Sequence, residues 1–261
     1  SSGSIDLDSL EGLLSGNTGL VSIMKANNET GVIMPIKEAA EITHRAGALF
    51  HTDAVQAVGK IPIDVKAEEI DLLSLSAHKF HGPKGIGALY ARKEIKLKPF
   101  MHGGHQEKGI RSGTYNIAGI VGLGKAADMA RQFIAEEALR TSFLLNKLES
   151  GILNGCPGTV IVGADAERLP NTATVLFVSV ESEAILTLID LAGISVSSGS
   201  ACSTGSKDPS YVLTSMGISA GDANTAIRFS LSTYTSDQEI DYVLEELLPI
   251  VEKLRKISPL A

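Results

Sequence analysis

Lys79 stands in a stretch whose residue types could carry out chemistry. An apolar run at 70–75 predicts a buried strand, and the run ends in polar residues just before the lysine. Glycines and a proline follow at 82–87, so Lys79 is expected in a loop at the carboxyl end of a strand, where open α/β sheets bind ligands. A lysine that is desolvated and close to other positive charge can lose its proton and act as a nucleophile or form a Schiff base. Taken alone, the stretch is more typical of a surface lysine in a glycine-rich turn.

Asp53 and Gln56 lie just beyond another expected strand, at 48–52. An acid at a strand end commonly caps the next turn or helix. It can equally pair with the ring nitrogen of a cofactor, as pyridoxal phosphate enzymes require to keep the pyridinium protonated. That second role needs a lysine at the end of an adjacent strand, and Lys79 lies one crossover further along the chain. Both interpretations remain open at this point.

Several other polar residues also allow a structural and a functional interpretation, namely Asn28, Ser76, His78, Thr114 and Arg228. Asn28 is typical of a turn. Ser76, His78 and Thr114 are either loop polar groups or donors suited to a phosphate. An arginine in a strand, as Arg228 is expected to be, is usually salt-bridged or extends its charge to solvent. Its planar guanidinium is also a natural bidentate partner for the α-carboxylate of an amino acid.

The two cysteines differ in their surroundings. Cys202 lies within 197–206, where small residues that cannot pack a core predict a mobile loop. An exposed thiol on such a tether suits a nucleophile that must visit two places. Cys156, within Asn-Gly-Cys-Pro-Gly, is interpreted as structural or incidental.

Two pairs of histidines with two residues between them invite a metal interpretation, His78 with His81 and His102 with His105. No carboxylate or cysteine ligand is grouped with either pair in the sequence, so no metal site is expected.

Composition narrows the class of protein. The chain has 261 residues, 44% of them hydrophobic and 20% charged, which is globular composition with ample material for a core. A net charge of −7 with no basic cluster argues against a nucleic-acid partner. No apolar run is long enough to span a bilayer and no secretory signal is present, so a cytoplasmic protein without a membrane partner is expected. Two cysteines make no disulfide framework and suggest a reducing compartment.

The order of the expected elements predicts an α/β fold. In the first half, strands are expected at 20–24, 48–52, 68–76 and 86–91, with a helix at 35–46. This alternation implies a mostly parallel sheet. After a long helix at 117–148, expected to be broken or kinked, the second half contains strands at 172–178, 195–198 and 226–230 and helices at 182–192 and 236–257. The last helix opens with a capping box at Ser236 and Glu239. We expect a large domain at 1–130 and a smaller one at 131–261.

Seven segments, which follow one another over nearly the whole chain, resemble the cysteine desulfurases of the NifS/IscS type. These are class V aminotransferase-like enzymes of the fold-type I pyridoxal phosphate superfamily. The segments are Asn27-Asn28-Glu29-Thr30-Gly31, His51-Thr52-Asp53-Ala54-Val55-Gln56, Ser76-Ala77-His78-Lys79, Gly82-Pro83-Lys84-Gly85, Arg111-Ser112-Gly113-Thr114, Ser198-Gly199-Ser200-Ala201-Cys202 and Arg228-Phe229-Ser230-Leu231. Chance agreement of all of them, in order and correctly spaced, is far less common than a match of any one motif.

The resemblance implies a role for each matched residue. Lys79 forms the Schiff base with pyridoxal 5'-phosphate and later moves protons, with His78 beside it. Asp53 pairs with the pyridine nitrogen and Gln56 contacts the ring hydroxyl. The phosphate is held by Ser76 and His78, and by Thr114 from the partner subunit of a homodimer. Asn28 and Arg228 receive the carboxylate of L-cysteine, and Cys202 takes the substrate's sulfur as a persulfide and releases alanine.

The same resemblance carries further expectations about the whole protein. It implies a mostly parallel, seven-stranded type of sheet, incomplete here, with a smaller α+β domain carrying Cys202. The family's amino-terminal portion is expected to be missing before Ile5. The sulfur would go to an acceptor or scaffold protein for iron–sulfur clusters or tRNA thiolation. The alternatives are another fold-type I enzyme, such as a selenocysteine lyase or aminotransferase, and a catalytically silent fragment that binds a partner.

Overall fold

The computed structural model describes residues 2–199 and 208–258, and these residues form two compact units. The unit that we call N-terminal comprises Ile5–Ala26 and Met34–Ile134. The other, which we call C-terminal, comprises Ser1–Ser4, Asn27–Ile33 and Ala135–Ala261. The short segment Asn27–Ile33 thus belongs with residues more than a hundred positions later in the chain.

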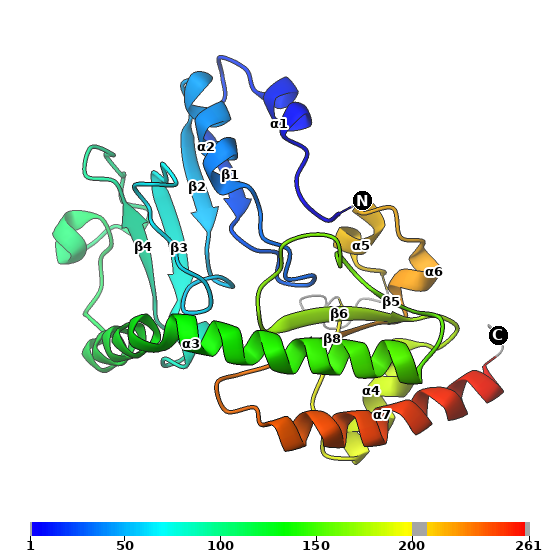
Figure 1. Cartoon of the computed structure of the whole chain (residues 1–261). Helices are drawn as coiled ribbons and strands as arrows, with labels where there is room; N and C mark the ends of the chain where they lie inside the picture. Colours follow the sequence, from blue (N-terminus) through cyan, green and yellow to red (C-terminus); the bar gives the residue numbers. More distant parts are fainter. Residues whose placement is uncertain (1, 200–207, 259–261) are drawn as a thin grey trace. The chain divides into compact units, whose positions relative to one another are not determined.

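The N-terminal unit is built on a four-stranded sheet in the order β1-β2-β3-β4 (Figure 1). Its strands are β1 (Leu20–Met24), β2 (Leu49–Asp53), β3 (Leu72–Ser76) and β4 (Gly87–Ala91). β1, β2 and β3 are parallel neighbours, and β4 is antiparallel to β3. Parallel neighbours need a crossover, which α2 (Ile36–Arg45) supplies between β1 and β2. The expectation of a mostly parallel sheet is confirmed.

The two faces of this sheet differ in polarity because side chains alternate along each strand. One face carries the apolar side chains of Val21, Phe50 and Leu73, which are all buried. Helix α2 contacts β2, and its buried side chains are those of Ile36, Ala39, Ala40, Ile42 and Thr43. The opposite face carries serines, a histidine and an aspartate, and these side chains are half-buried or exposed. The polar face is therefore where a ligand can reach the sheet.

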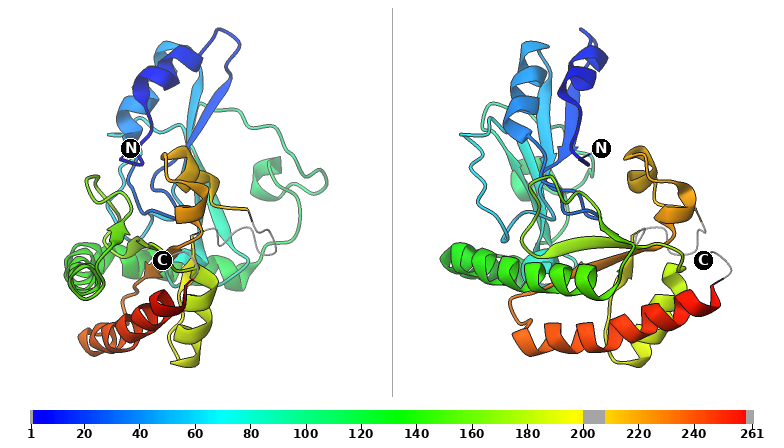
Figure 2. Two further views of the ribbon diagram at one scale, coloured as in Figure 1. Left: turned by 90° about the vertical axis from the view of Figure 1, so that its right-hand side faces the viewer. Right: turned by 45° about the vertical axis from the view of Figure 1, so that its right-hand side comes forward.

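The C-terminal unit contains an antiparallel sheet in the order β5-β6-β8-β7. Its strands are β5 (Thr159–Ile161), β6 (Thr172–Phe177), β7 (Ser197–Ser198) and β8 (Ala226–Ser230). Helices α4 (Ser182–Leu191) and α7 (Asp237–Ile257) lie side by side on one side of β6 and β8, and the short α5 (Tyr211–Ser215) and α6 (Ala220–Ala223) lie on the other (Figures 1 and 2). An antiparallel sheet with helices gathered on its faces is the α+β arrangement expected here.

The main core of this unit packs the last turns of α3 (Ile117–Gly155) with α4 and α7 against the sheet. Its fully buried members include Leu148, Phe177, Ile189, Ile227 and Leu247. α7 starts at the expected capping box, in which Ser236 Oγ accepts from the Glu239 N–H and the Glu239 side chain accepts from the Ser236 N–H.

Several elements of the structure differ from what the sequence predicts. α3 is one continuous helix that ends at Gly155, not a broken one that ends near 148. The elements β5, α5 and α6 are not expected from the sequence, because each has only three to five residues and shows no periodicity. Helix α1 (Leu7–Leu13) is capped by Asp6, whose side chain accepts from the Ser9 N–H at 2.6 Å. Among the described residues, no helix is both long and apolar enough to cross a membrane.

Candidate functional site

Lys79 lies in the short 3-10 helix η1 (Ala77–Phe80), directly after β3. Ala77 and Phe80 are buried and anchor the turn, which leaves Lys79 half-buried and His78 exposed. The chain then turns sharply through His81, whose φ is 67°, into Gly82. A Cβ on Gly82 would lie 2.8 Å from Ala77 Cβ, so only glycine fits there. Within the described part of the chain, Lys79 Nζ makes no hydrogen bond or ion pair and is available for a ligand.

Asp53 ends β2, the parallel neighbour of β3. It is in register with Ser74, so its carboxylate and the Ser76–Lys79 turn lie at the same edge of the sheet. Asp53 Oδ1 accepts a hydrogen bond from the Val55 N–H at 2.9 Å, which fixes the direction of the carboxylate. The acid and the lysine therefore stand on adjacent strand ends, which the cofactor-binding interpretation requires.

The remaining predicted residues of the N-terminal unit lie in three different segments. Ser76 Oγ and His78 Nδ1 are 2.8 Å apart, so they form one polar pair at the end of β3. Gln56 Oε1 accepts from Lys60 Nζ at 3.4 Å, within the turn that follows Asp53. Thr114 is exposed in the loop between the 3-10 helix η2 (Gln106–Gly109) and α3.

Asn28 and Arg228 come together in the C-terminal unit, although 200 residues separate them. Arg228 is half-buried on β8, and its Nη1 donates to the Asn28 carbonyl oxygen at 2.7 Å. The backbone of Asn28, and not its side chain, makes this contact. The neighbouring Asn27 shapes the turn instead, since its Oδ1 accepts from the N–H groups of Glu29 and Thr30. The guanidinium is thereby held in place beside the asparagine predicted to share its ligand.

Glu29 is a buried carboxylate that the sequence analysis did not single out. It is 6% exposed, and its Oε2 accepts from Ser210 Oγ at 2.5 Å. Its carbonyl oxygen accepts from Thr174 Oγ1 on β6 at 2.6 Å. Burial raises the pKa of Glu29, while the Ser210 hydroxyl and the charge of Arg228 act in the opposite direction. Nothing in the local sequence distinguishes a buried glutamate in this turn from an exposed one.

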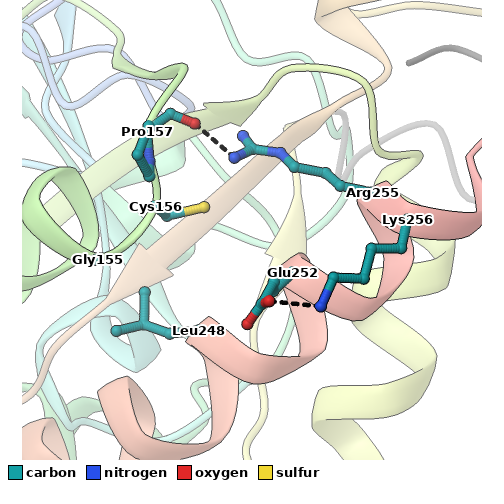
Figure 3. A pocket seen from close by; sticks show the side chains of 7 residues that line it. All are labelled: Gly155, Cys156, Pro157, Leu248, Glu252, Arg255 and Lys256. Carbon is teal, nitrogen blue, oxygen red and sulfur yellow. Dashed lines mark hydrogen bonds and ion pairs between the residues drawn. The ribbon is translucent and has the colours of Figure 1, made fainter.

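Cys202 and its surroundings, 200–207, lie outside the described residues. The other cysteine, Cys156, is buried and lines a pocket of about 290 Å³ in the C-terminal unit (Figure 3). Burial raises the pKa of the Cys156 thiol, although the nearby Arg255 opposes the shift. The pocket contains none of the predicted site residues. It is formed by the end of α3 and by α7, where Arg255 Nη1 donates to the Pro157 carbonyl oxygen at 2.5 Å.

The predicted residues thus fall into two sets. Asp53, Gln56, Ser76, His78, Lys79 and Thr114 belong to the N-terminal unit, and Asn28 and Arg228 belong to the C-terminal unit. The residues described by the structure include no group of three histidine, cysteine, aspartate or glutamate side chains that could hold a metal ion.

Comparisons with known proteins give a consistent result. The family model for aminotransferase class-V matches residues 1–243. A cysteine desulfurase from Gluconacetobacter diazotrophicus is 52% identical over 257 residues, which cover 98% of this chain and 64% of that protein. This chain therefore spans just under two thirds of the length of that relative.

Solved structures agree with the sequence relatives. The X-ray structure of a NifS-like protein from Rickettsia africae has a TM-score of 0.89 and 37% identity, over 96% of this chain and 68% of that one. A structure of SspA in complex with cysteine has a TM-score of 0.74 and 36% identity, over 90% of this chain and 65% of that one.

Proposed function

Because this chain belongs to the aminotransferase class-V family, we propose that it acts as a pyridoxal 5'-phosphate-dependent cysteine desulfurase. The reaction converts L-cysteine to L-alanine and leaves the sulfur as a persulfide on Cys202. The similarity to the desulfurase of Gluconacetobacter diazotrophicus supports this assignment. The observation that carries it is the placement of Asp53 and Lys79 at the ends of two adjacent parallel strands.

The residues at this edge fit pyridoxal 5'-phosphate. Asp53 is oriented by the Val55 N–H and would face the ring nitrogen, and Gln56 would contact the ring hydroxyl. Lys79, whose Nζ has no partner among the described residues, would hold the cofactor covalently. Ser76 and His78 would donate to its phosphate, since both are polar donors at one strand end. When bound, the cofactor supplies an electron sink for the carbon next to the substrate's amine.

Substrate recognition is assigned to Asn28 and Arg228. A half-buried guanidinium that the Asn28 carbonyl holds in place can bind an α-carboxylate with two parallel hydrogen bonds. The complex of SspA with cysteine supports the choice of an amino acid with a thiol. Lys79 Nζ would take the proton from the α-carbon and return one to the product.

Sulfur transfer is assigned to Cys202. Its thiolate attacks the sulfur of the substrate, so that a sulfur–sulfur bond forms while the substrate's carbon–sulfur bond breaks. The electron pair of the broken bond stays with the carbon fragment, which takes up protons and leaves as alanine. The persulfide on Cys202 then passes its outer sulfur to an acceptor or scaffold protein for iron–sulfur clusters or tRNA thiolation.

A homodimer belongs to the same proposal, with Thr114 reaching the phosphate held by the partner subunit. Large apolar side chains exposed in the N-terminal unit support an interface there, among them Phe100, Ile117 and Val121. Sedimentation should give the mass of two chains, and a monomeric mass would contradict the proposal.

A cofactor titration tests the assignment. The native chain should develop a visible absorbance band with pyridoxal phosphate, and Lys79→Ala should not. With L-cysteine, the loaded native chain should release alanine, whereas Cys202→Ala should not. Turnover that persists in Cys202→Ala would point to an aminotransferase. A folded native chain without any band would refute cofactor binding by this chain and leave the binding-partner alternative.

A further inference from the structure

His51 is held by hydroxyl groups from both neighbouring strands. Its Nδ1 lies 2.7 Å from Ser22 Oγ on β1, and its Nε2 lies 2.9 Å from Ser74 Oγ on β3. A serine hydroxyl can donate or accept, so the two serines satisfy a neutral imidazole in either tautomer. The ring therefore ties the three parallel strands together through their side chains.

Asp53 follows His51 by two residues, so the two side chains project from the same face of β2. The other side chains on this face of the three strands are all uncharged, namely Leu20, Ser22, Met24, Leu49, Leu72, Ser74 and Ser76. Across β1, β2 and β3, the one carboxylate on the polar face is that of Asp53. His51 is the one other side chain there whose charge can change near neutral pH.

The surroundings of His51 favour its neutral form. Burial lowers the pKa of His51, and the carboxylate of Asp53 is the charged neighbour that opposes the shift. A neutral ring leaves the negative charge of Asp53 without a cationic partner on this face. A protonated ring would compete with a ligand for that charge.

We propose that His51 is a positioning residue for the cofactor, because it fixes the three strands beside Asp53 and leaves the carboxylate free to pair with the pyridine nitrogen. The inference rests on the proposed function. It gives a role to His51, the first residue of the segment 51–56, in which the family resemblance implies roles for Asp53 and Gln56.

The first test uses the chain without cofactor. Histidine-selective NMR should follow the imidazole signals through a pH titration, with the His51 signal identified by its loss in His51→Gln. His51 should protonate at lower pH in the folded chain than in the chain unfolded in urea. Protonation of His51 at the same pH in both states would overturn the proposal.

The second test measures cofactor binding by variants at His51. His51→Lys places a fixed positive charge beside Asp53, so pyridoxal phosphate affinity should fall about tenfold or more. The pH midpoint of the visible band should also shift by about one unit. His51→Gln, which keeps a donor and an acceptor for the two serines, should stay within about twofold of the native chain. Unchanged affinity and midpoint in a folded His51→Lys would refute the role.

If His51→Lys does not fold, His51→Leu replaces it, since leucine removes both hydrogen bonds without adding charge. The affinity of His51→Leu for pyridoxal phosphate should fall while the pH midpoint of any remaining band stays in place, and native affinity would refute the positioning role.

Different results would refute the proposed function and the role of His51. A native chain without any band refutes the proposed function, whereas a normal native band with an unchanged His51→Lys refutes the role of His51 alone.

Discussion

Ser210→Ala should destabilise the C-terminal unit by much more than an ordinary loss of a helix cap. Ser210 Oγ accepts from the Leu213 N–H at 3.2 Å and so caps α5, an interaction worth about 1 kcal/mol. The same hydroxyl donates to the Glu29 carboxylate, and a hydrogen bond to a charged group is worth about 1.5–3 kcal/mol. Both side chains are more than nine-tenths buried, so water cannot readily replace the donor. The expected loss in the free energy of unfolding is about 2–4 kcal/mol.

This loss should depend on pH. Burial raises the pKa of Glu29 in the folded chain, and the hydrogen bond from the Ser210 hydroxyl makes this increase smaller. Ser210→Ala should therefore raise the pKa of Glu29 further. A carboxyl whose pKa is raised by folding contributes stability that is complete below its unfolded pKa and is lost as pH rises through the folded pKa. The cost of Ser210→Ala should accordingly be smallest near about pH 4 and grow towards neutral pH.

Urea unfolding followed by circular dichroism measures these differences in a double-mutant cycle of Ser210→Ala and Glu29→Gln. The matched control is Ser219→Ala, since Ser219 Oγ caps α6 by accepting from the Asp222 N–H at 3.0 Å but lies at the surface. Ser219→Ala should lower the free energy of unfolding by about 1 kcal/mol. The reasoning would be refuted if Ser210→Ala cost no more than Ser219→Ala, or if the two changes in the cycle were additive at neutral pH.

Three further outcomes are expected. Arg228→Lys should raise the KM for L-cysteine about 10- to 100-fold, since an ammonium cannot bind a carboxylate through two parallel hydrogen bonds. The affinity for pyridoxal phosphate in the cofactor titration should not change. An unchanged KM would show that Arg228 does not bind the substrate. Glu149→Ala should lower the free energy of unfolding, measured in urea, by about 3–5 kcal/mol. The guanidinium of Arg168 pairs with the largely buried Glu149 carboxylate at 2.6 and 3.0 Å, and the substitution leaves it without this partner. A loss below about 1 kcal/mol would mean that the pair behaves as a surface ion pair. Cys156 should react slowly with iodoacetamide in the folded chain, because burial raises the pKa of its thiol; alkylation at the rate seen in the unfolded chain would contradict its burial.

The sequence predicts the edge of the parallel sheet well, for a physical reason. An apolar run followed by polar and glycine residues marks where a strand leaves the core, so the positions of Asp53 and Lys79 at strand ends are predicted from local pattern alone. The family resemblance drawn from the short motifs is confirmed by the aminotransferase class-V match over residues 1–243. The roles of the individual site residues remain predictions.

Other features depend on contacts that no local pattern encodes. The hydrogen bond from Arg228 to the Asn28 carbonyl joins residues 200 positions apart, and the burial of Glu29 follows from the packing of β6 and α5 around it. The position of His51 between two serines can be predicted only when the strand register is known, because its partners lie 29 and 23 residues away in the sequence. In each case tertiary structure, and not sequence spacing, decides which groups meet.

We propose that Lys79 and Cys202 act in one desulfurase reaction, and mass spectrometry tests this joint role most directly. After incubation with pyridoxal phosphate and L-cysteine, the peptide that contains Cys202 should gain the mass of one sulfur atom, and the peptide that contains Cys156 should not. Lys79→Ala should abolish the gain. A native chain that binds the cofactor and consumes L-cysteine without sulfur on Cys202, or a Lys79→Ala chain that still acquires it, would contradict the account.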